Sequence, residues 1–239
     1  MSTTLAKYYA QLGDAVEDIY LEPDMDEDID DMSIHLGNLL SGHTVLELGC
    51  GTGYWTEVVA ESATSVLALD INANLVDIAR ERGMPADKVA FRVADALDLP
   101  EDIGKFSAVL VSFLWSHLTK GEQEKLLATL KKRLGKDVLL VILDESFVEG
   151  FSETTARTDA EGTTWEIQTL DGERFELPKS YPSDSALRKR IGACITQPGE
   201  QPADAVIQRL ARIGHPHLAR GALEQPRADG GFQFLDTAA

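Results

Sequence analysis

The sequence has 239 residues, of which 44% are hydrophobic and 26% are charged, as in an ordinary globular protein with one main domain. The 40 Asp and Glu outnumber the 22 Lys and Arg, so the formal net charge is −18 with His neutral. Such an excess of acid opposes binding to nucleic-acid phosphates and to anionic membrane surfaces. We therefore expect neither nucleic acid nor membrane as a partner.

The apolar runs are short and the cysteines are few. The longest runs, such as Val138–Leu143, cannot span a bilayer. No apolar signal segment is found in the first residues, so we expect a cytoplasmic protein. Cys50 and Cys194 provide neither a disulfide framework nor a zinc site, and no metal is expected.

Residues 1–43 are expected to form a helical cap. Ten carboxylates lie within the eighteen residues from Asp14 to Asp31, with a few apolar residues among them. This pattern predicts a solvated helix face rather than a calcium loop. From Met32 the apolar residues follow helical spacing until Gly42 ends the run.

Residues 44–195 are expected to form the main domain, in which short apolar runs alternate with helical patterns. A Thr119–Glu122 capping box begins one of the helices, and Gly135 ends it. The alternation predicts an α/β fold with a doubly wound, mostly parallel sheet. Strands are predicted at Thr44–Leu48, Ser65–Asp70, Val89–Val93, Ser107–Ser112 and Val138–Leu143, and helices at Tyr54–Glu61 and Leu75–Arg82.

The alternation weakens after Asp144. Thr163–Leu170 and Glu173–Leu177 flank an Asp-Gly pair and predict a β-hairpin. A short helix is predicted at Ser183–Ile191. Residues 196–239 are expected to be a divergent or loosely ordered tail, with one short helix at Val206–Ile213 and no strong strand.

The most informative segment is Glu-Leu-Gly-Cys-Gly-Thr-Gly, from Glu47 to Gly53, which follows the first predicted strand. Glycines allow positive φ angles and the close approach of a ligand, and this turn lies where open α/β sheets bind ligands. Asp70 ends the next strand, where a carboxylate can accept hydrogen bonds from ribose hydroxyls. The combination indicates a cofactor that contains a nucleoside.

The glycine spacing distinguishes among such cofactors. A dinucleotide loop, G-x-G-x-x-G, would place its third glycine at Tyr54. Glu47 is unfavourable beside a pyrophosphate but suits a cationic ligand. No Walker lysine follows the glycines, and no tyrosine has the lysine four residues later that a short-chain dehydrogenase needs. A nicotinamide dehydrogenase is therefore only our third choice.

From about Tyr8 to Ile191 the sequence resembles the class I S-adenosylmethionine-dependent methyltransferases, whose E/D-x-G-x-G-x-G loop is complete here. The resemblance implies a Rossmann-like sheet of strand order 3-2-1-4-5 and S-adenosyl-L-methionine as cofactor. It implies a ribose contact for Asp70 and an adenine contact for Asp95. The implied cofactor-binding residues are Tyr20, Glu47, Gly49, Cys50, Gly51, Gly53, Asp70, Ile71, Asp95, Ala96 and Ser112, with Tyr8 and Tyr9 as further candidates from the cap.

Methyl transfer from a sulfonium needs alignment and desolvation more than a nucleophilic side chain. A hydroxyl acceptor can be helped by a general base, and His117, near the end of the fourth strand, is the candidate catalytic residue. Asp144 and Glu145 are candidates for binding a polar or cationic substrate. Trp55 is expected mainly to pack the helix on which it lies.

The resemblance also bears on the acceptor. No Asn/Asp/Ser-Pro-Pro-Tyr/Phe motif follows the fourth strand, and this absence, with the acidic charge, favours a small-molecule acceptor over nucleic acid. A protein methyltransferase and a non-catalytic S-adenosylmethionine-binding regulator are the alternatives. Family members usually complete the sheet with an antiparallel pair, strands six and seven, for which the tail offers no convincing pattern.

Overall fold

A six-stranded sheet forms the centre of the computed structural model, which describes residues 1–21, 26–135, 138–147, 156–195 and 205–211. The strand order is β3-β2-β1-β4-β5-β9, and each neighbouring pair is parallel. The predicted order 3-2-1-4-5 is therefore confirmed. The strands are β1 (Thr44–Leu48), β2 (Ser65–Asp70), β3 (Val89–Val93), β4 (Ala108–Ser112), β5 (Leu139–Ser146) and β9 (Ala205–Ala211).

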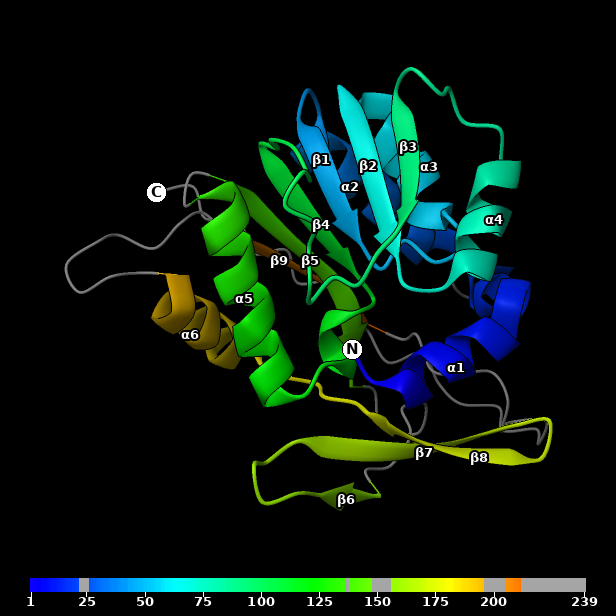
Figure 1. Cartoon of the computed structure of the whole chain (residues 1–239), viewed down its shortest axis with the longest axis vertical. Coiled ribbons are helices and arrows are strands. Elements are labelled where there is room, and N and C mark those ends of the chain that lie inside the picture. The colour runs from blue at the N-terminus through cyan, green and yellow to red at the C-terminus, as the bar shows by residue number, and fades with distance from the viewer. Residues whose placement is uncertain (22–25, 136–137, 148–155, 196–204, 212–239) are drawn as a thin grey trace.

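Helices cover both faces of this sheet (Figure 1). α2 (Asp26–Leu40) and α3 (Tyr54–Ser62) share one hydrophobic cluster with the sheet. α5 (Lys120–Leu134) and α6 (Asp184–Ile195) share the cluster on the opposite face. α4 (Ala73–Glu81) packs along β2 and β3.

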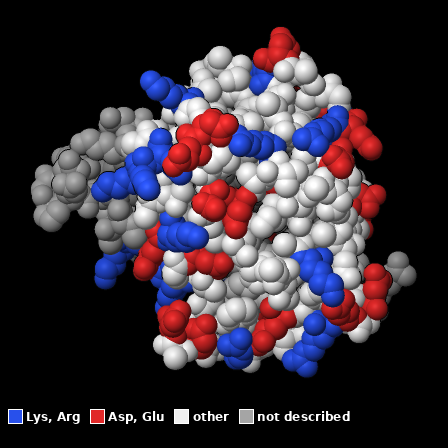
Figure 2. Space-filling view, in the orientation of Figure 1, with Lys and Arg blue, Asp and Glu red and all other residues white. Residues whose placement is uncertain are grey.

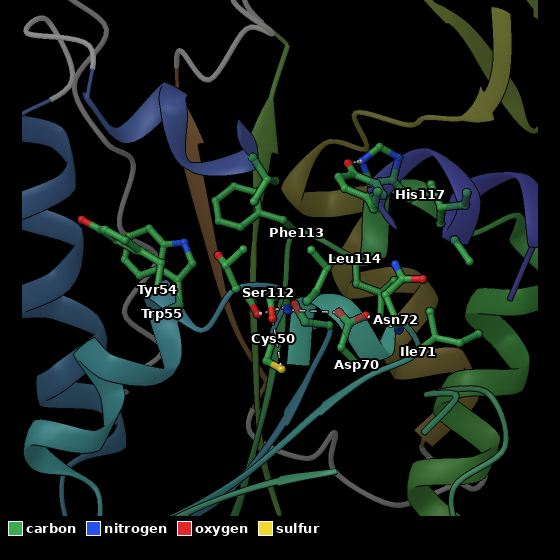
Figure 3. A pocket seen from close by; sticks show the side chains of 18 of the residues that line it. Cys50, Tyr54, Trp55, Asp70, Ile71, Asn72, Ser112, Phe113, Leu114 and His117 are labelled. Carbon is green, nitrogen blue, oxygen red and sulfur yellow. Dashed lines mark hydrogen bonds between the residues drawn. The ribbon is translucent and has the colours of Figure 1, made fainter. Parts of the chain in front are cut away.

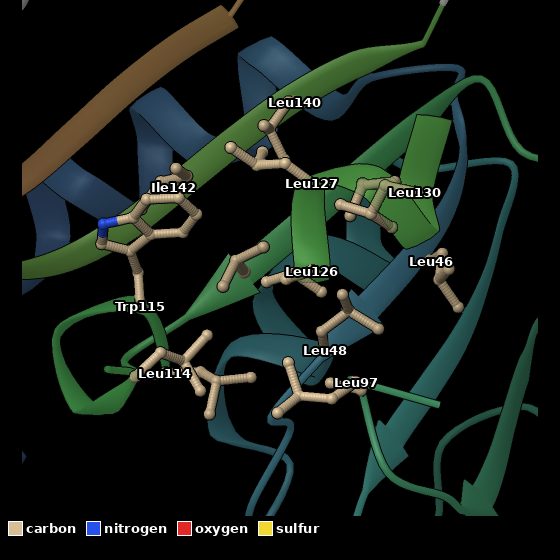
Figure 4. Close-up of a cluster of buried hydrophobic side chains, with 14 of the residues drawn as sticks. Leu46, Leu48, Leu97, Leu114, Trp115, Leu126, Leu127, Leu130, Leu140 and Ile142 are labelled. Carbon is tan, nitrogen blue, oxygen red and sulfur yellow. The ribbon is translucent and has the colours of Figure 1, made fainter. Parts of the chain in front are cut away.

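The two clusters explain why the strands are continuous apolar runs. In β1, Val45 belongs to the cluster with α2 and α3, whereas Leu46 and Leu48 belong to the cluster with α5. Figure 4 shows these two leucines in the cluster that also contains Leu126 and Leu130 of α5. Because the central strands β1 and β4 are covered on both sides, successive side chains along them are buried.

The predicted capping box of α5 is present. The Thr119 hydroxyl accepts a hydrogen bond from the Glu122 amide at 3.3 Å, and the Glu122 carboxylate accepts one from the Thr119 amide at 3.0 Å. Two backbone donors at the start of the helix are thus satisfied.

A second, antiparallel sheet lies beyond the carboxyl ends of the parallel strands, in the order β6 (Arg157–Thr158), β7 (Thr164–Leu170) and β8 (Glu173–Pro178). The predicted hairpin is confirmed. Asp171 and Gly172 both have positive φ, as the tight turn requires. α1 (Thr3–Leu12) packs its buried residues against Phe175 and Leu177 of β8, and the 3₁₀ helix η1 (Gly13–Leu21) follows it.

The helix predicted at Val206–Ile213 is wrong over the part that the structure describes. Residues Ala205–Ala211 form β9, which pairs with β5 from Leu140↔Ala205 to Ser146↔Ala211. Short apolar segments do not separate helix from strand by periodicity, and the unpaired edge of β5 offers backbone partners to this one. The expected absence of a strong strand in the tail is thus also wrong here, and residues 212–239 lie outside the described residues.

Two further properties concern the surface and the helices. On the face shown in Figure 2, Lys and Arg side chains are intermixed with Asp and Glu. Within the described segments, no helix combines the length and the apolar character needed to cross a membrane. The division of the chain into a cap, a main domain and a tail, with boundaries after residues 43 and 195, stays a prediction.

Candidate functional site

A pocket of about 740 Å³, open mouth included, lies where β1, β2 and β4 end. The ends of parallel strands meet at one edge of the sheet, and their following loops diverge to form the crevice. α1, η1 and the short 3₁₀ helix η3 (Trp115–His117) supply the other walls. The lining residues are Met1, Leu5, Ala6, Tyr9, Val16, Tyr20, Gly49–Thr52, Tyr54, Trp55, Asp70–Asn72, Leu75, Ser112–Leu114 and His117.

The glycine loop lies at the base of this pocket, and its three glycines all have positive φ. A Cβ atom would lie 3.1 Å from Leu114 Cβ at Gly49 and 2.9 Å from Ala79 Cβ at Gly53, but would meet nothing within 4 Å at Gly51. Gly49 and Gly53 thus permit close packing inside the protein, while Gly51 borders the open pocket. Gly53 does not itself line the pocket.

Asp70 connects the glycine loop to the end of β2. Its carboxylate accepts hydrogen bonds from the Gly51 amide at 3.0 Å and the Asn72 amide at 2.8 Å. Burial raises the pKa of Asp70, although these amides act in the opposite direction. Figure 3 shows Asp70, Ile71 and Asn72 together on one side of the pocket. Asn72 was not predicted, although its position two residues after Asp70 was a usable signal.

An aromatic wall, in which Figure 3 labels Tyr54, Trp55 and Phe113, faces them from the other side, and Tyr20 completes it. The Tyr20 and Tyr54 rings stack with centroids 4.3 Å apart, and Trp55 Nε1 donates a hydrogen bond to Tyr20 Oη at 2.9 Å. Trp55 therefore packs its helix, as predicted, and also lines the pocket. Aromatic faces of this kind attract cations and exclude water.

His117 lines the pocket beside Tyr9 and is held at both ring nitrogens. Nδ1 lies 3.1 Å from the Pro178 carbonyl oxygen, and Nε2 lies 2.8 Å from Tyr9 Oη. A carbonyl oxygen can only accept, so Nδ1 must carry a proton, and when the ring is neutral Nε2 accepts from Tyr9. Lys179 Nζ, which no sequence pattern indicated, lies 3.4 Å from the same Nε2.

Comparisons with known proteins agree with this geometry. The family described as "Methyltransferase domain" matches residues 45–137. This match and the shared fold support the class I S-adenosylmethionine-dependent methyltransferases as the family of this chain. A structure of DhpI in complex with SAM and HEP superposes with a TM-score of 0.63 at 26% identity, covering 81% of this chain and 90% of that one.

Two curated methyltransferases match over shorter stretches. Demethylmenaquinone methyltransferase of Clavibacter sepedonicus is 38% identical over 31% of this chain and 30% of its own length. Protein-L-isoaspartate O-methyltransferase of Rhodopseudomonas palustris is 32% identical over 41% of this chain and 43% of its own. The chain thus spans less than half the length of these curated relatives.

Glu47, the acid of the methyltransferase glycine motif, lies beneath the pocket and does not line it. Its side chain is 0% exposed and accepts hydrogen bonds from Thr56 Oγ1 at 2.6 Å and Ser112 Oγ at 3.0 Å. Burial raises the pKa of Glu47 to about 7. Ser112, which does line the pocket, lies between Glu47 and the open space. Burial also raises the pKa of the Cys50 thiol, so this pocket residue stays protonated.

Asp95 and Ala96 are not among the residues that line the pocket. The Asp95 carboxylate accepts hydrogen bonds from the Met1 amino group at 2.9 Å and from the Leu97 amide at 2.8 Å. Ala96 is buried in the hydrophobic cluster with Leu97. The structure does not bring these two residues together with the glycine loop, and their cofactor contacts stay predictions.

Asp144, Glu145 and Tyr8 also lie outside the pocket lining. Asp144 accepts a hydrogen bond from the Ser116 amide at 2.7 Å, and Glu145 pairs with Lys179 at 2.9 Å. Burial raises the pKa of Asp144. The two acids thus hold the turn that carries His117, whereas Tyr8 packs against Phe175.

Arg82, another residue that the sequence did not indicate, fastens the glycine loop from outside. Its Nε donates to the Thr52 carbonyl at 2.7 Å, and its guanidinium pairs with Glu57 at 2.6 Å and with Glu17 of η1. Arg82 also lies over the Tyr54 ring, 5.8 Å from its centroid. One cation thereby joins the loop, α3 and the N-terminal cap.

Proposed function

We propose that this chain binds S-adenosyl-L-methionine and transfers its methyl group to a small-molecule acceptor by in-line displacement. One observation carries the proposal: the glycine loop and Asp70 line the same pocket and are joined by the Gly51 amide. The DhpI structures, 25% and 26% identical to this chain, are complexes with SAH and with SAM and HEP, and they support the same cofactor.

The residues present fit this cofactor. Gly51 borders open space that a Cβ would enter, and Asp70 reaches the pocket with a carboxylate fixed by two backbone amides. Each Asp70 oxygen keeps a further lone pair with which to accept a ribose hydroxyl. Ile71 would lie beside the adenine, and Tyr20 would close the pocket from the cap. Glu47 would act on the cofactor through Ser112.

When bound, the cofactor supplies a sulfonium whose methyl carbon is electrophilic. The protein's tasks are then to align the acceptor, to exclude water and to take up the proton that the acceptor loses. The aromatic wall excludes water. His117, as a neutral imidazole with Nδ1 protonated, accepts this proton in the end at its basic Nε2.

A small acceptor is favoured because α1 and η1 cover the pocket with Leu5, Tyr9, Val16 and Tyr20. The demethylmenaquinone methyltransferase relative supports this class, whereas the protein-L-isoaspartate relative supports a protein acceptor as the second candidate. A non-catalytic S-adenosylmethionine-binding regulator is the third, and binding without transfer to any acceptor would support it. Cytoplasmic localisation stays a prediction from the sequence.

Calorimetric titration with S-adenosylmethionine, S-adenosylhomocysteine and NAD tests the cofactor. We expect binding of the first two and none of NAD. Asp70→Asn should weaken S-adenosylhomocysteine binding about tenfold or more, since hydrogen bonds to a charged carboxylate are worth about 1.5–3 kcal/mol each. Asp77→Asn, on the exposed side of α4, is the matched control and should bind as the wild type does. Unchanged affinity in Asp70→Asn, or preference for NAD, would refute the assignment.

A further inference from the structure

The contact between Tyr9 and His117 has a defined direction. Nδ1 of His117 donates to the Pro178 carbonyl, so in the neutral ring Nε2 is the nitrogen that accepts hydrogen bonds. The Tyr9 hydroxyl, 2.8 Å away, therefore donates its proton to Nε2. The Lys179 ammonium at 3.4 Å from Nε2 favours the same neutral ring. The oxygen of Tyr9 retains lone pairs with which to accept a hydrogen bond from the pocket.

The two side chains differ in their access to the pocket. His117 is only 3% exposed, enclosed by η3 and by the end of β8. Tyr9 is partly exposed and stands on α1, which covers the pocket. An acceptor that enters the pocket can therefore reach the Tyr9 oxygen with less rearrangement than it would need to reach Nε2.

We propose that Tyr9 is a catalytic residue that relays the acceptor's proton to His117, an inference that rests on the proposed methyl transfer. As the acceptor atom takes the methyl group, its proton passes to Tyr9 Oη while the Tyr9 proton passes to His117 Nε2. Tyr9 ends unchanged and His117 ends as an imidazolium. The positive charge lost when the sulfonium becomes a thioether reappears on the ring, so atoms and charge balance.

Buried charges beside His117 bear on this final state. Lys179 stands near three buried acids, Asp144, Glu145 and Glu166, and forms an ion pair with Glu145. The Lys179 ammonium opposes a positive charge on the nearby ring, and the acids around it offset part of that repulsion. Burial, with the added effect of these acids, raises the pKa of Tyr9 well above its ordinary value. Tyr9 therefore remains a protonated phenol that can pass on a proton.

The same walls indicate the acceptor class. Among the lining residues that the structure describes, no side chain is Lys or Arg, and the Met1 amino group and Lys179 are already paired with Asp95 and Glu145, so an anionic acceptor would compete with these acids for a counter-charge. The aromatic wall, with Leu5, Ala6 and Val16, favours an apolar or aromatic frame. The acceptor that fits is a neutral molecule whose hydroxyl donates to Tyr9.

Tyr9→Phe and Tyr8→Phe form a matched pair for the test. Both remove one phenolic hydroxyl from α1, but Tyr8 lies outside the pocket. S-adenosylhomocysteine should bind the wild type and both variants with similar affinity. Transfer from radiolabelled S-adenosylmethionine to catechol should fall about 100-fold in Tyr9→Phe, within the range for general acid–base catalysis, and stay near the wild-type rate in Tyr8→Phe. Equal rates in wild type and Tyr9→Phe overturn the relay, and transfer to phenethylamine but not catechol overturns the hydroxyl class.

Nitrogen NMR of histidine-labelled protein provides a readout that needs no acceptor. The chain has five histidines, and His117→Gln identifies the signals of His117. We expect a protonated Nδ1 and an Nε2 that accepts a hydrogen bond, with the Nε2 signal moving in Tyr9→Phe and not in Tyr8→Phe. A proton on Nε2, or a signal indifferent to Tyr9→Phe, overturns the relay even if catechol is no substrate. Failure of the wild type to bind S-adenosylhomocysteine would instead overturn the proposed function.

Discussion

Replacing Glu47 with glutamine isolates the effect of a buried carboxyl group under the glycine loop. Glu47 is 0% exposed and accepts hydrogen bonds from the hydroxyls of Thr56 and Ser112. Glutamine has nearly the same shape but does not titrate. A hydroxyl can also accept a hydrogen bond, so the Thr56 or the Ser112 hydroxyl can rotate to accept one from the new amide NH₂ group. The substitution therefore removes the titration while keeping the packing.

The magnitude follows from the shift in pKa. Burial raises the pKa of Glu47 from 4.5 to about 7, so between these values the folded protein keeps a proton that the unfolded chain releases. Stability must then fall as the pH rises from the unfolded to the folded pKa. Single-site linkage gives a penalty of about 1.4 kcal/mol at about pH 5.5 and about 3.4 kcal/mol at about pH 8.5. The stability of Glu47→Gln relative to the wild type should thus rise by about 2 kcal/mol over this interval.

Urea denaturation at constant ionic strength, repeated across this pH interval, measures the difference. Glu81→Gln, on the exposed surface of α4, controls for the loss of one negative charge. The quantity that matters is the slope of the stability difference against pH, because the baseline also contains the altered hydrogen bonds. A difference that stays constant or falls with rising pH would show that Glu47 is ionised at little cost in the folded state, and the reasoning would be refuted.

Three further substitutions test the local structure. Gly53→Ala should lower the free energy of unfolding by about 2 kcal/mol or more, because its Cβ would lie 2.9 Å from that of Ala79 at a φ of 85°. Gly51→Ala, with open space around it, should cost only about 1 kcal/mol but should weaken S-adenosylhomocysteine binding. Equal losses of stability in Gly53→Ala and Gly51→Ala would contradict the different packing roles given to these two glycines. Thr119→Ala should cost about 1 kcal/mol by removing the capping box of α5, and an unchanged urea midpoint would argue against it.

Much of the central fold could be predicted because its strands are buried on both faces. Such strands are apolar runs bounded by turn residues, and β1, β4 and β5 have this pattern most clearly. β9 does not stand out in the same way. Its sequence, Ala-Val-Ile-Gln-Arg-Leu-Ala, fits either a short helix or a strand, and pairing with β5 decides between them.

The candidate site was predictable where it follows directly from a strand end. Gly49, Gly51, Asp70 and Ser112 all line or border the pocket, as their positions in the chain indicate. Glu47 shows the limit of that reasoning. Side chains alternate along a strand, and the alternation turns Glu47 towards Thr56 of α3 instead of into the pocket.

Contacts between distant segments leave no periodic pattern in the sequence. Tyr9 and His117 lie 108 positions apart, and they meet because α1 packs between β8 and the pocket. Lys179 reaches the same histidine from the far end of the hairpin. Neither spacing follows from secondary structure, so the Tyr9–His117 pair could be found only once the topology was known.

The walls of the pocket have different origins in the chain, and this division bears on specificity. The family match spans residues 45–137, which contain the glycine loop and Asp70. Tyr9, Tyr20 and Lys179 lie outside that span, on the cap and the hairpin. The proposed cofactor site is thus built from the part that matches methyltransferases, while most groups around the proposed proton relay belong to segments outside it. A change of acceptor among such proteins can then arise in the cap and hairpin while the glycine loop stays intact.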